Sequence, residues 1–339
     1  CLYFRQDEDG GICIISLYVD DLVIAGSSIE LINEIKRGLS ERYKMKDLGK
    51  VNHILGCEAD HNEETGTTYL SQYQYTKAAV EKYLPADMTE INSPCDPSVN
   101  LSKLQSPQSL EERGEMEGVP YRQAVGTLLW LSLGTRPDIC YAVSQVAKFN
   151  DCYGMEHWRA VLRIFRYLKG TPKLGLKFSS IDSSSSFIKR FNTATFLKDL
   201  ECVYYKQGNR SLSDKDVLES LGFVDSNLAR DLDNRKSITG FIFFLGCCAI
   251  SWQSKQQASV ALSSMEAEYM AACAATQEAI WLRRLLQEFG CLFTRPFTLL
   301  EDNQACIFLS KNPGDFPKTK HIAQRYHFVR EQVNEGEII

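Results

Sequence analysis

The sequence predicts a mixed α/β and α+β protein made of more than one folded unit. Short β-branched strands and helices with regular apolar spacing alternate at both ends of the chain. Between them lies a serine-rich stretch, 179–216, that lacks any convincing periodicity. With 339 residues, of which 44% are hydrophobic and 24% are charged, each half has enough apolar side chains for its own core. We therefore expect segments at 1–100, 101–178, 179–216 and 217–339.

Composition and charge exclude several classes of protein. No run approaches 18 consecutive apolar residues, so a membrane-spanning helix is not expected. The net charge of -5 and the isoelectric point near 5.7 argue against a protein held on nucleic acid by bulk charge. This net charge is compatible with an enzyme that binds nucleic acid through a local site. The 12 cysteines form no C-x-x-C pair, which predicts reduced structural thiols and an intracellular compartment. Because the chain begins at Cys1 rather than methionine, we expect it to be a piece of a longer protein.

The N-terminal segment begins with a predicted hairpin. Residues 13–19 and 22–25 are apolar and rich in β-branched side chains, and Asp20 and Asp21 lie between them as the turn. The other elements expected here are a helix over 29–43, strands at 51–58 and 67–71, and a helix over 72–83.

The middle of the chain is predicted to be helical. Residues 93–118 are rich in Ser, Pro and Glu, and we interpret them as a linker or extended arm. Pro137 is placed to open the second of three helices, which are expected over 121–133, 138–149 and 156–168. The stretch 179–216 is interpreted as an insertion or flexible connector.

The C-terminal segment returns to an alternating pattern. Three strands in succession predict a meander, and the long helix that follows leads into a strand able to pair in parallel with the first. The expected strands are 221–224, 238–245, 249–254 and 297–300, and the expected helices are 266–289, 304–310 and 322–333.

The hairpin places two carboxylates at its tip. Asp20 and Asp21 are adjacent and follow a rigid apolar strand. Phosphoryl transfer by two metal ions needs several carboxylates that converge on the metals, and a hairpin tip can supply two of them. Adjacent aspartates are also ordinary turn residues, so the residues alone leave both interpretations open.

Three further acids form a second candidate group in the C-terminal segment. Asp225 and Asp302 are each expected at the end of a strand, and parallel pairing would bring both to one sheet edge, where α/β active sites commonly form. Ser263 and Glu266 match a capping box, which gives Glu266 a structural role at the helix start. Glu268 lies about 200° further around the helix and can face the sheet edge. The alternative is that these three acids lie apart in the fold and share no function.

A series of motifs, in order along the chain, then resembles one family. The hairpin sequence LYVDDLVIAGSS is similar to the polymerase hairpin of copia-type retrotransposon reverse transcriptases. The resemblance covers nearly the whole chain except 179–216. It continues through MKDLG (45–49), LGTRPDI (133–139), YLKGT (167–171), RKSITGFIFFLG (235–246), ISWQSKQQ (250–257), ALSSMEAEYMA (261–271) and TKHIAQRYHFVRE (319–331). The chain thus resembles a Pol polyprotein fragment that spans late reverse transcriptase and ribonuclease H.

This resemblance implies a partial palm and thumb-like region followed by a ribonuclease H-like mixed-sheet domain. Asp20 and Asp21 match two carboxylates of the polymerase palm, and Asp225, Glu268 and Asp302 match three metal-binding acids of ribonuclease H. The implied activities are RNA-directed DNA polymerisation and two-metal hydrolysis of the RNA strand of RNA–DNA hybrids, with Mg²⁺ or Mn²⁺ as cofactor. Template–primer nucleic acid, hybrids and other Pol segments are the implied partners, in the cytoplasm or in virus-like particles.

The sequence also departs from the family pattern. The family draws another palm aspartate from sequence before the hairpin and a fourth ribonuclease H acid from a helix after the GEI strand, and we expect both sites to be incomplete here. Ala323 stands where the family usually has Asp, and Leu228 replaces an aromatic residue. The alternative is therefore a degenerate, inactive retrotransposon remnant that at most binds nucleic acid.

Overall fold

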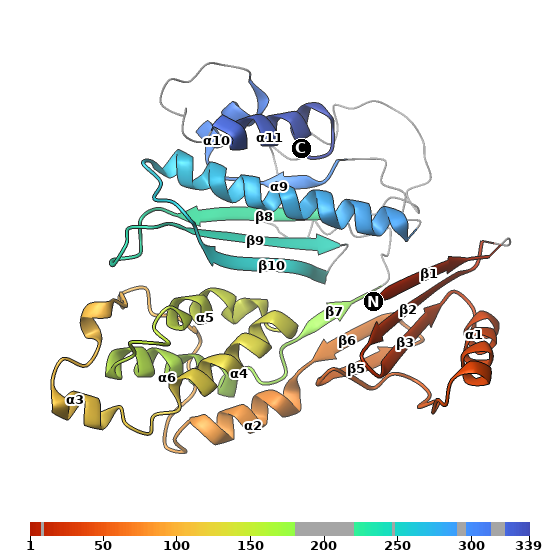
Figure 1. Cartoon of the computed structure of the whole chain (residues 1–339), viewed down its shortest axis with the longest axis horizontal. Coiled ribbons are helices and arrows are strands. Elements are labelled where there is room, and N and C mark those ends of the chain that lie inside the picture. The colour runs from red at the N-terminus through yellow and green to blue at the C-terminus, as the bar shows by residue number, and fades with distance from the viewer. Residues whose placement is uncertain (8–9, 180–219, 246–247, 290–295, 313–322) are drawn as a thin grey trace.

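The described part of the chain forms three sheets and a group of packed helices (Figure 1). The computed structural model describes residues 1–7, 10–179, 220–245, 248–289, 296–312 and 323–339. Except for Ser179, the predicted connector 179–216 lies outside these residues. No helix in the described part of the chain is both long enough and apolar enough to cross a membrane.

The first sheet contains the predicted hairpin. Its antiparallel strands, in spatial order, are β1 (Leu2–Gln6), β2 (Ile12–Tyr18) and β3 (Asp21–Gly26). Tyr18 pairs with Asp21, so the turn is Val19 and Asp20, one residue earlier than the predicted Asp20 and Asp21. The sequence analysis missed β1, which pairs with β2 along its whole length. Helix α1 (Ile29–Arg42) confirms the prediction for 29–43, and its N-cap Ser28 accepts a hydrogen bond from the Leu31 N–H.

The second sheet joins parts of the chain that are far apart in sequence. Its strands, in spatial order, are β4 (His53–Ile54), β5 (Cys57–Asn62), β6 (Thr67–Ser71) and β7 (Leu176–Phe178). The single strand predicted over 51–58 is wrong, because Leu55 and Gly56 adopt positive φ angles of 50° and 76° and turn the chain into a hairpin. β7 pairs antiparallel with β6 across about 100 residues of intervening helices. This sheet therefore anchors both ends of the helical unit.

The helical unit packs around one apolar core. Its elements are α2 (Tyr73–Tyr83), η1 (Lys103–Gln105), α3 (Leu110–Glu115), α4 (Tyr121–Gly134), η2 (Pro137–Ile139), α5 (Cys140–Ala147) and α6 (Met155–Gly170). The core side chains are fully buried and include Tyr121, Leu128, Val143, Val161 and Phe165. The three predicted helices are present, and Pro137 opens a short 3-10 turn before α5.

The predicted linker 93–118 is not a free arm. It contains the short elements η1 and α3, and its side chains are tied to other units. The Ser102 hydroxyl donates to Asp233 Oδ1 at 2.7 Å, and Asp96 forms an ion pair with Arg163 at 3.3 Å. Residues that are polar by composition are thus held in place by tertiary contacts that the sequence pattern does not reveal.

The C-terminal unit has the predicted meander and crossover. Its elements are β8 (Ser220–Asn227), β9 (Ile238–Leu245), β10 (Cys248–Gln256), α9 (Ser264–Glu288), β11 (Thr298–Leu300), α10 (Gln304–Lys311) and α11 (Ala323–Asn334). The strand order is β10-β9-β8-β11, with β11 parallel to β8 and the other pairs antiparallel. Phe297, next to β11, forms a parallel bridge with Ile338 near the C-terminus.

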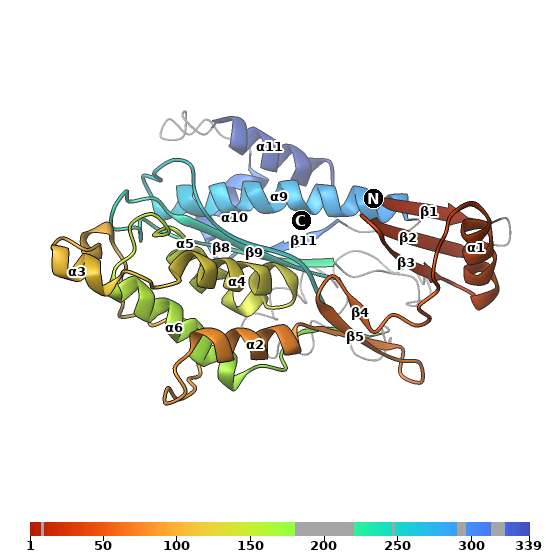
Figure 2. The ribbon, with the colours of Figure 1, turned by 60° about the horizontal axis from the view of Figure 1, so that its bottom comes forward.

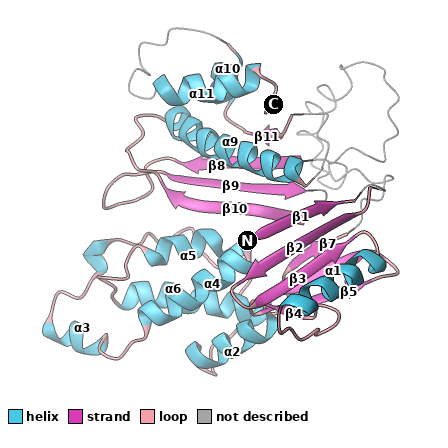
Figure 3. Ribbon diagram, turned by 45° about the vertical axis from the view of Figure 1, so that its right-hand side comes forward, coloured by secondary structure: helices cyan, strands magenta, loops and turns pink. Residues whose placement is uncertain are grey.

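The C-terminal sheet lies between two layers of helices. α9 covers one face, and α4 and α5 lie on the side of the other face (Figures 1 and 2). Several polar contacts join the helical unit to the C-terminal unit. Among them, the Trp252 indole N–H donates to the Ser132 carbonyl at 2.7 Å, and Lys148 pairs with Asp231 at 2.9 Å. The two units therefore form a defined interface beside the sheet, which Figure 3 shows from a second side.

Replacing Trp252 by Phe should weaken this interface. The Ser132 carbonyl lies in the last turn of α4, where carbonyl groups have no N–H partner within the helix. The Trp252 indole N–H supplies the hydrogen bond instead. We expect Trp252→Phe to lower the free energy of unfolding by about 1 to 2 kcal/mol, the cost of leaving a partly buried carbonyl without its donor. Urea denaturation measures this change. Trp281 is 55% exposed, so Trp281→Phe is the matched control and should change stability by less than about 0.5 kcal/mol.

Candidate metal centre

Two parallel strands position the first two acids. Asp225 lies on β8, and Asp302 follows β11 by two residues. Leu300 pairs with Phe223, so the parallel register brings both aspartates to the same region of the sheet. The prediction that Asp225 ends its strand is wrong, because β8 continues to Asn227 and Asp225 pairs with Gly240 of β9. Asp225 is thus held by ladder hydrogen bonds rather than by a loop.

The start of α9 separates the roles of two glutamates. Ser263 is the N-cap, and its hydroxyl accepts a hydrogen bond from the Glu266 N–H at 3.2 Å. The Glu266 carboxylate accepts from the Leu262 N–H at 2.8 Å, so it is engaged at the helix terminus. Glu268 lies two residues further on, just over half a turn around the helix. It is 7% exposed and faces the aspartates. The helix geometry therefore assigns Glu268, and not Glu266, to the cluster.

The three carboxylates converge. Asp225, Glu268 and Asp302 each offer an oxygen, and these oxygens all lie within 4.8 Å of one another. Glu268 is buried, whereas the two aspartates are exposed, so the cluster opens to solvent on the aspartate side. Glu268 Oε2 has no hydrogen-bond partner in the described part of the chain. An unpaired carboxylate oxygen that is buried beside two other acids is costly unless a cation or a proton compensates it.

Charge repulsion and burial alter how these acids titrate. Burial, followed by the nearby charges of Glu301 and Asp225, raises the pKa of Glu268 to about 7. Burial and the neighbouring Asp302 carboxylate also raise the pKa of Asp225. The folded chain thus brings like charges together, and no ion pair to these acids is found among the described residues. A bound cation would neutralise such a group.

Sequence reasoning missed Glu301. This residue immediately precedes Asp302, and its carboxylate accepts a hydrogen bond from the Asn303 N–H at 2.9 Å. Burial raises the pKa of Glu301 to about 7, and the Asp302 and Asp225 charges add to the rise. Glu301 lies outside the group of mutually close ligand oxygens but contributes to its negative potential. The adjacent acids Glu301 and Asp302 in the sequence could have indicated that a second acid lies near the cluster. The sequence does not show which of the two joins it.

A groove runs from the acid cluster along the sheet face opposite α9. Its volume is about 520 Å³. Phe223 and Trp252 form part of its sheet wall, Tyr141 contributes from α5, and Asp225 and Asp302 are among its lining residues. The helical unit therefore supplies one wall of the space in front of the carboxylates, which the sequence did not indicate.

The hairpin acids are arranged differently. Asp20 and Asp21 are exposed, and within the described residues the only group of three or more metal-binding side chains is the one around Asp225. Val19 at the tip has φ of 52°, a left-handed conformation that costs energy for a β-branched residue. The structure thus brings together Asp225, Glu268 and Asp302, whereas no third acid from the described ranges joins Asp20 and Asp21.

Replacing Glu268 by Gln should stabilise the metal-free chain at alkaline pH. The pKa of Glu268 is 4.5 in an unfolded chain and about 7 in the folded protein, so the folded state binds this proton more tightly. The free energy of unfolding therefore falls as pH rises from 4.5 to 7 and stays low above it. We expect Glu268→Gln to raise the free energy of unfolding by about 1 to 2 kcal/mol at pH 8 and by much less at pH 4.5. Urea denaturation with a chelator at both pH values checks this, and an equal effect at the two would contradict it.

Comparisons with known proteins identify relatives across the chain. A family model described as reverse transcriptase (RNA-dependent DNA polymerase) matches residues 1–100. The retrovirus-related Pol polyprotein from transposon TNT 1-94 of Nicotiana tabacum is 38% identical over 335 residues, which are 99% of this chain and 22% of that protein. The corresponding polyprotein from transposon RE1 of Arabidopsis thaliana is 34% identical over 320 residues, 94% of this chain and 19% of that protein.

A shorter relative matches over most of its own length. An uncharacterised mitochondrial protein of Arabidopsis thaliana is 31% identical over 269 residues, which are 78% of this chain and 92% of that protein. By contrast, the chain spans about a fifth of the length of the Pol polyproteins that it matches. No solved structure matches it.

Proposed function

The chain belongs to the copia-type retrotransposon Pol polyprotein family and carries a reverse transcriptase-like region, and from this premise we propose a function for its C-terminal unit. Residues 217–339 form a ribonuclease H-like domain that hydrolyses the RNA strand of RNA–DNA hybrids. The observation that carries the proposal is the convergence of the Asp225, Glu268 and Asp302 oxygens within 4.8 Å. Three acids from a strand, a helix start and a strand end, gathered at one place, suit metal-assisted phosphodiester hydrolysis.

The donor set fits Mg²⁺ or Mn²⁺. All three ligands are carboxylate oxygens, the hard donors that these cations prefer, and the histidine and thiol ligands that favour zinc are absent from the group. The unpartnered Oε2 of Glu268 gives a buried oxygen whose negative charge a cation would compensate. When bound, the metal ions supply Lewis-acid stabilisation of the attacking and leaving oxygens.

The protein would hold the three acids rigidly and orient the nucleic-acid strand beside them. Asp225 is fixed by the β8 ladder and Glu268 by the first turns of α9, so the ligands are placed on rigid elements rather than on loops. The groove between the sheet face and Tyr141 offers a path for one strand beside the acids. Hybrid recognition of this kind depends on backbone shape and the ribose 2′-OH rather than on base sequence.

The hairpin acids are assigned by the same family relationship. Asp20 and Asp21 are proposed as palm carboxylates that bind metal ions for RNA-directed DNA polymerisation on a template–primer. Because the chain spans about a fifth of its Pol relatives, polymerisation and contacts with other Pol segments are proposed for the longer protein.

A degenerate remnant that binds nucleic acid without cleaving it is the second candidate. The presence of Ala323 where the family usually has Asp favours it. One assay separates the candidates: a hybrid labelled on each strand is incubated with the chain in Mg²⁺ or Mn²⁺. Metal-dependent cleavage of the RNA strand alone supports the ribonuclease H assignment. Retained hybrid binding with no cleavage in either metal supports the remnant, and cleavage of the DNA strand contradicts both.

A further inference from the structure

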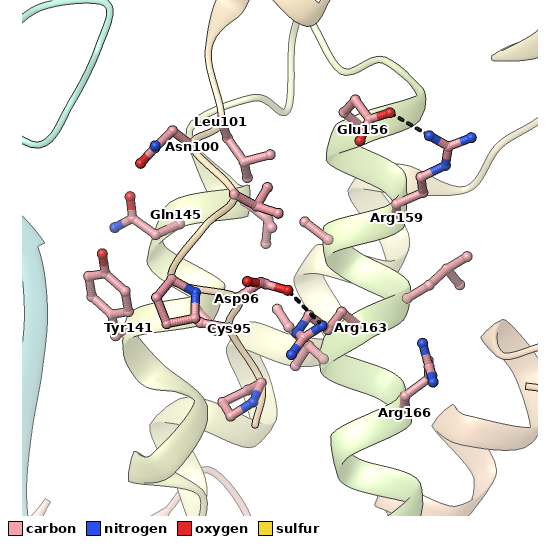
Figure 4. Close-up of a pocket in the computed structure, with 18 of the residues that line it drawn as sticks. Cys95, Asp96, Asn100, Leu101, Tyr141, Gln145, Glu156, Arg159, Arg163 and Arg166 are labelled. Atoms are coloured by element: carbon pink, nitrogen blue, oxygen red, sulfur yellow. Dashed lines mark hydrogen bonds and ion pairs between the residues drawn. The ribbon is translucent and has the colours of Figure 1, made fainter. Parts of the chain in front are cut away.

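A second cavity lies in the helical unit, away from the acid cluster. It has a volume of about 500 Å³, within the range of small-molecule sites. Figure 4 shows its walls: the segment 95–101 runs between α5, which contributes Tyr141 and Gln145, and α6. Arg159, Arg163 and Arg166 all come from α6, where spacings of four and three residues place them on one helix face. None of the acids of the metal centre lines this cavity.

The cavity is positively charged although the chain is acidic overall. Its lining contains five basic side chains and two acidic ones, whereas the whole chain has a net charge of -5. Three basic residues are balanced by ion pairs, which are Arg159 with Glu156, Arg163 with Asp96, and Lys148 with Asp231.

Arg166 and Arg230 make no ion pair within the described residues. Arg166 donates to the carbonyl and hydroxyl of Thr89, and Arg230 donates to the carbonyl of Pro97. Carbonyl and hydroxyl acceptors fix the direction of a guanidinium group without cancelling its charge. Two positive charges that no described carboxylate pairs with therefore line the cavity, which favours an anionic ligand.

One arginine also has an unused donor. Arg163 Nε is buried and has no hydrogen-bond partner in the part of the chain that the structure describes. This nitrogen has almost no accessible surface, so the guanidinium groups of Arg166 and Arg230 are the ones that a ligand in the cavity can reach. Guanidinium groups match phosphate oxygens in geometry and charge.

The other walls suit a flat apolar group. Pro94, Pro97 and the Tyr141 ring line the cavity, and apolar side chains such as Val99 and Leu101 join them. Aromatic rings stack on nucleic-acid bases whatever the base, whereas an acidic peptide has no planar group of this kind to place there.

We propose that this cavity binds a nucleoside phosphate unit, either as a free nucleotide or as one residue of a single strand. The phosphate faces the arginines of α6 and Arg230, and the base lies against Tyr141 and the prolines. None of the acids of the cluster lines this cavity, and Tyr141 is shared between the cavity and the groove beside the acids.

Fluorescence anisotropy of the whole chain tests the proposal. The probes are a labelled adenosine monophosphate and a labelled eight-residue oligothymidylate, titrated in EDTA so that the metal centre does not contribute. We expect saturable binding that the double variant Arg166→Gln/Arg230→Gln weakens about tenfold or more. Arg122 is a matched control: it is exposed, pairs with Asp151 and lies outside the cavity, so Arg122→Gln should change affinity by less than about twofold.

The results with the two probes distinguish a free nucleotide from a strand residue as the ligand, and both from an acidic peptide. Binding of both probes, with displacement of the strand by free nucleotide, identifies the cavity as a nucleotide pocket, and binding of the strand alone identifies a strand residue as the ligand. No binding of either probe, equal weakening by Arg122→Gln, or tighter binding of a polyglutamate peptide would overturn the proposal.

A second measurement does not depend on the arginine variants. Cys95 is a free thiol that lines the cavity, and the bound ligand should slow its alkylation by a maleimide severalfold. Mass spectrometry of the digested chain reads Cys95 separately from the exposed Cys1, whose alkylation should not change. Equal alkylation of Cys95 with and without a bound probe would also overturn the proposal.

Discussion

Under the proposed function, Asp225→Asn should reduce cleavage of the RNA strand by about a thousandfold or more in Mg²⁺. The substitution keeps the size of the side chain but removes one of three charges whose oxygens lie within 4.8 Å. A neutral amide binds a divalent cation much more weakly than a carboxylate does, so the variant should bind the cation much more weakly than the wild-type chain. The measurement is the initial rate of RNA-strand cleavage in a labelled hybrid, with wild-type chain and variant compared at equal concentration.

Glu266→Gln is the matched control for this prediction. Glu266 is two residues from Glu268 on the same helix, but its carboxylate accepts from the Leu262 N–H at the helix start. A glutamine oxygen can accept the same hydrogen bond, so cleavage should stay within about threefold of wild type. Cleavage that survives Asp225→Asn, or that is lost equally in Glu266→Gln, would refute the assignment of the metal ligands.

Arg136→Met should destabilise the helical unit by about 3 to 5 kcal/mol. Arg136 is 1% exposed, pairs with Asp138 at 2.7 Å, and donates to the carbonyl and hydroxyl of Thr171 at 2.9 and 2.8 Å. Its guanidinium also lies over the ring of Tyr167. Methionine fills much of the same volume, but it leaves the Thr171 carbonyl without the Arg136 donor and the Asp138 carboxylate without its positively charged partner, with the Tyr167 hydroxyl still donating to it.

Urea denaturation of the whole chain measures this loss. Arg122→Met is the control, because the Arg122 side chain is 67% exposed and its ion pair with Asp151 should contribute less than about 1 kcal/mol. Adding Asp138→Asn to Arg136→Met should recover part of the loss, since it removes the unpaired charge. Similar losses for Arg136→Met and Arg122→Met would show that the buried ion pair does not hold η2 against the end of α6.

Local patterns in the sequence determined the helices, most strands and the family. Apolar spacing located α1, α4 and α9 to within two residues at each end, because one buried face imposes the same period wherever the helix packs. Capping chemistry separated Glu266 from Glu268, because the hydrogen bonds of an N-cap depend only on residues within one turn. Parallel pairing of the strands near Asp225 and Asp302 also followed from the order of elements.

Only the tertiary structure decided the features that depend on distant partners. β7 pairs with β6 across about 100 residues of sequence. A strand of three residues is too short for its alternation of apolar and polar side chains to be recognised in the sequence. Arg136 is buried by residues of the helical unit that lie up to 35 positions away in the sequence. Tyr141 forms a wall beside the acid cluster, and Arg230 joins the cavity along α6, only because the C-terminal unit packs against the helical unit. The spacing of residues in the sequence does not predict these long-range contacts. The burial of a side chain and the pairing of its charge depend on residues that are close in space rather than along the chain.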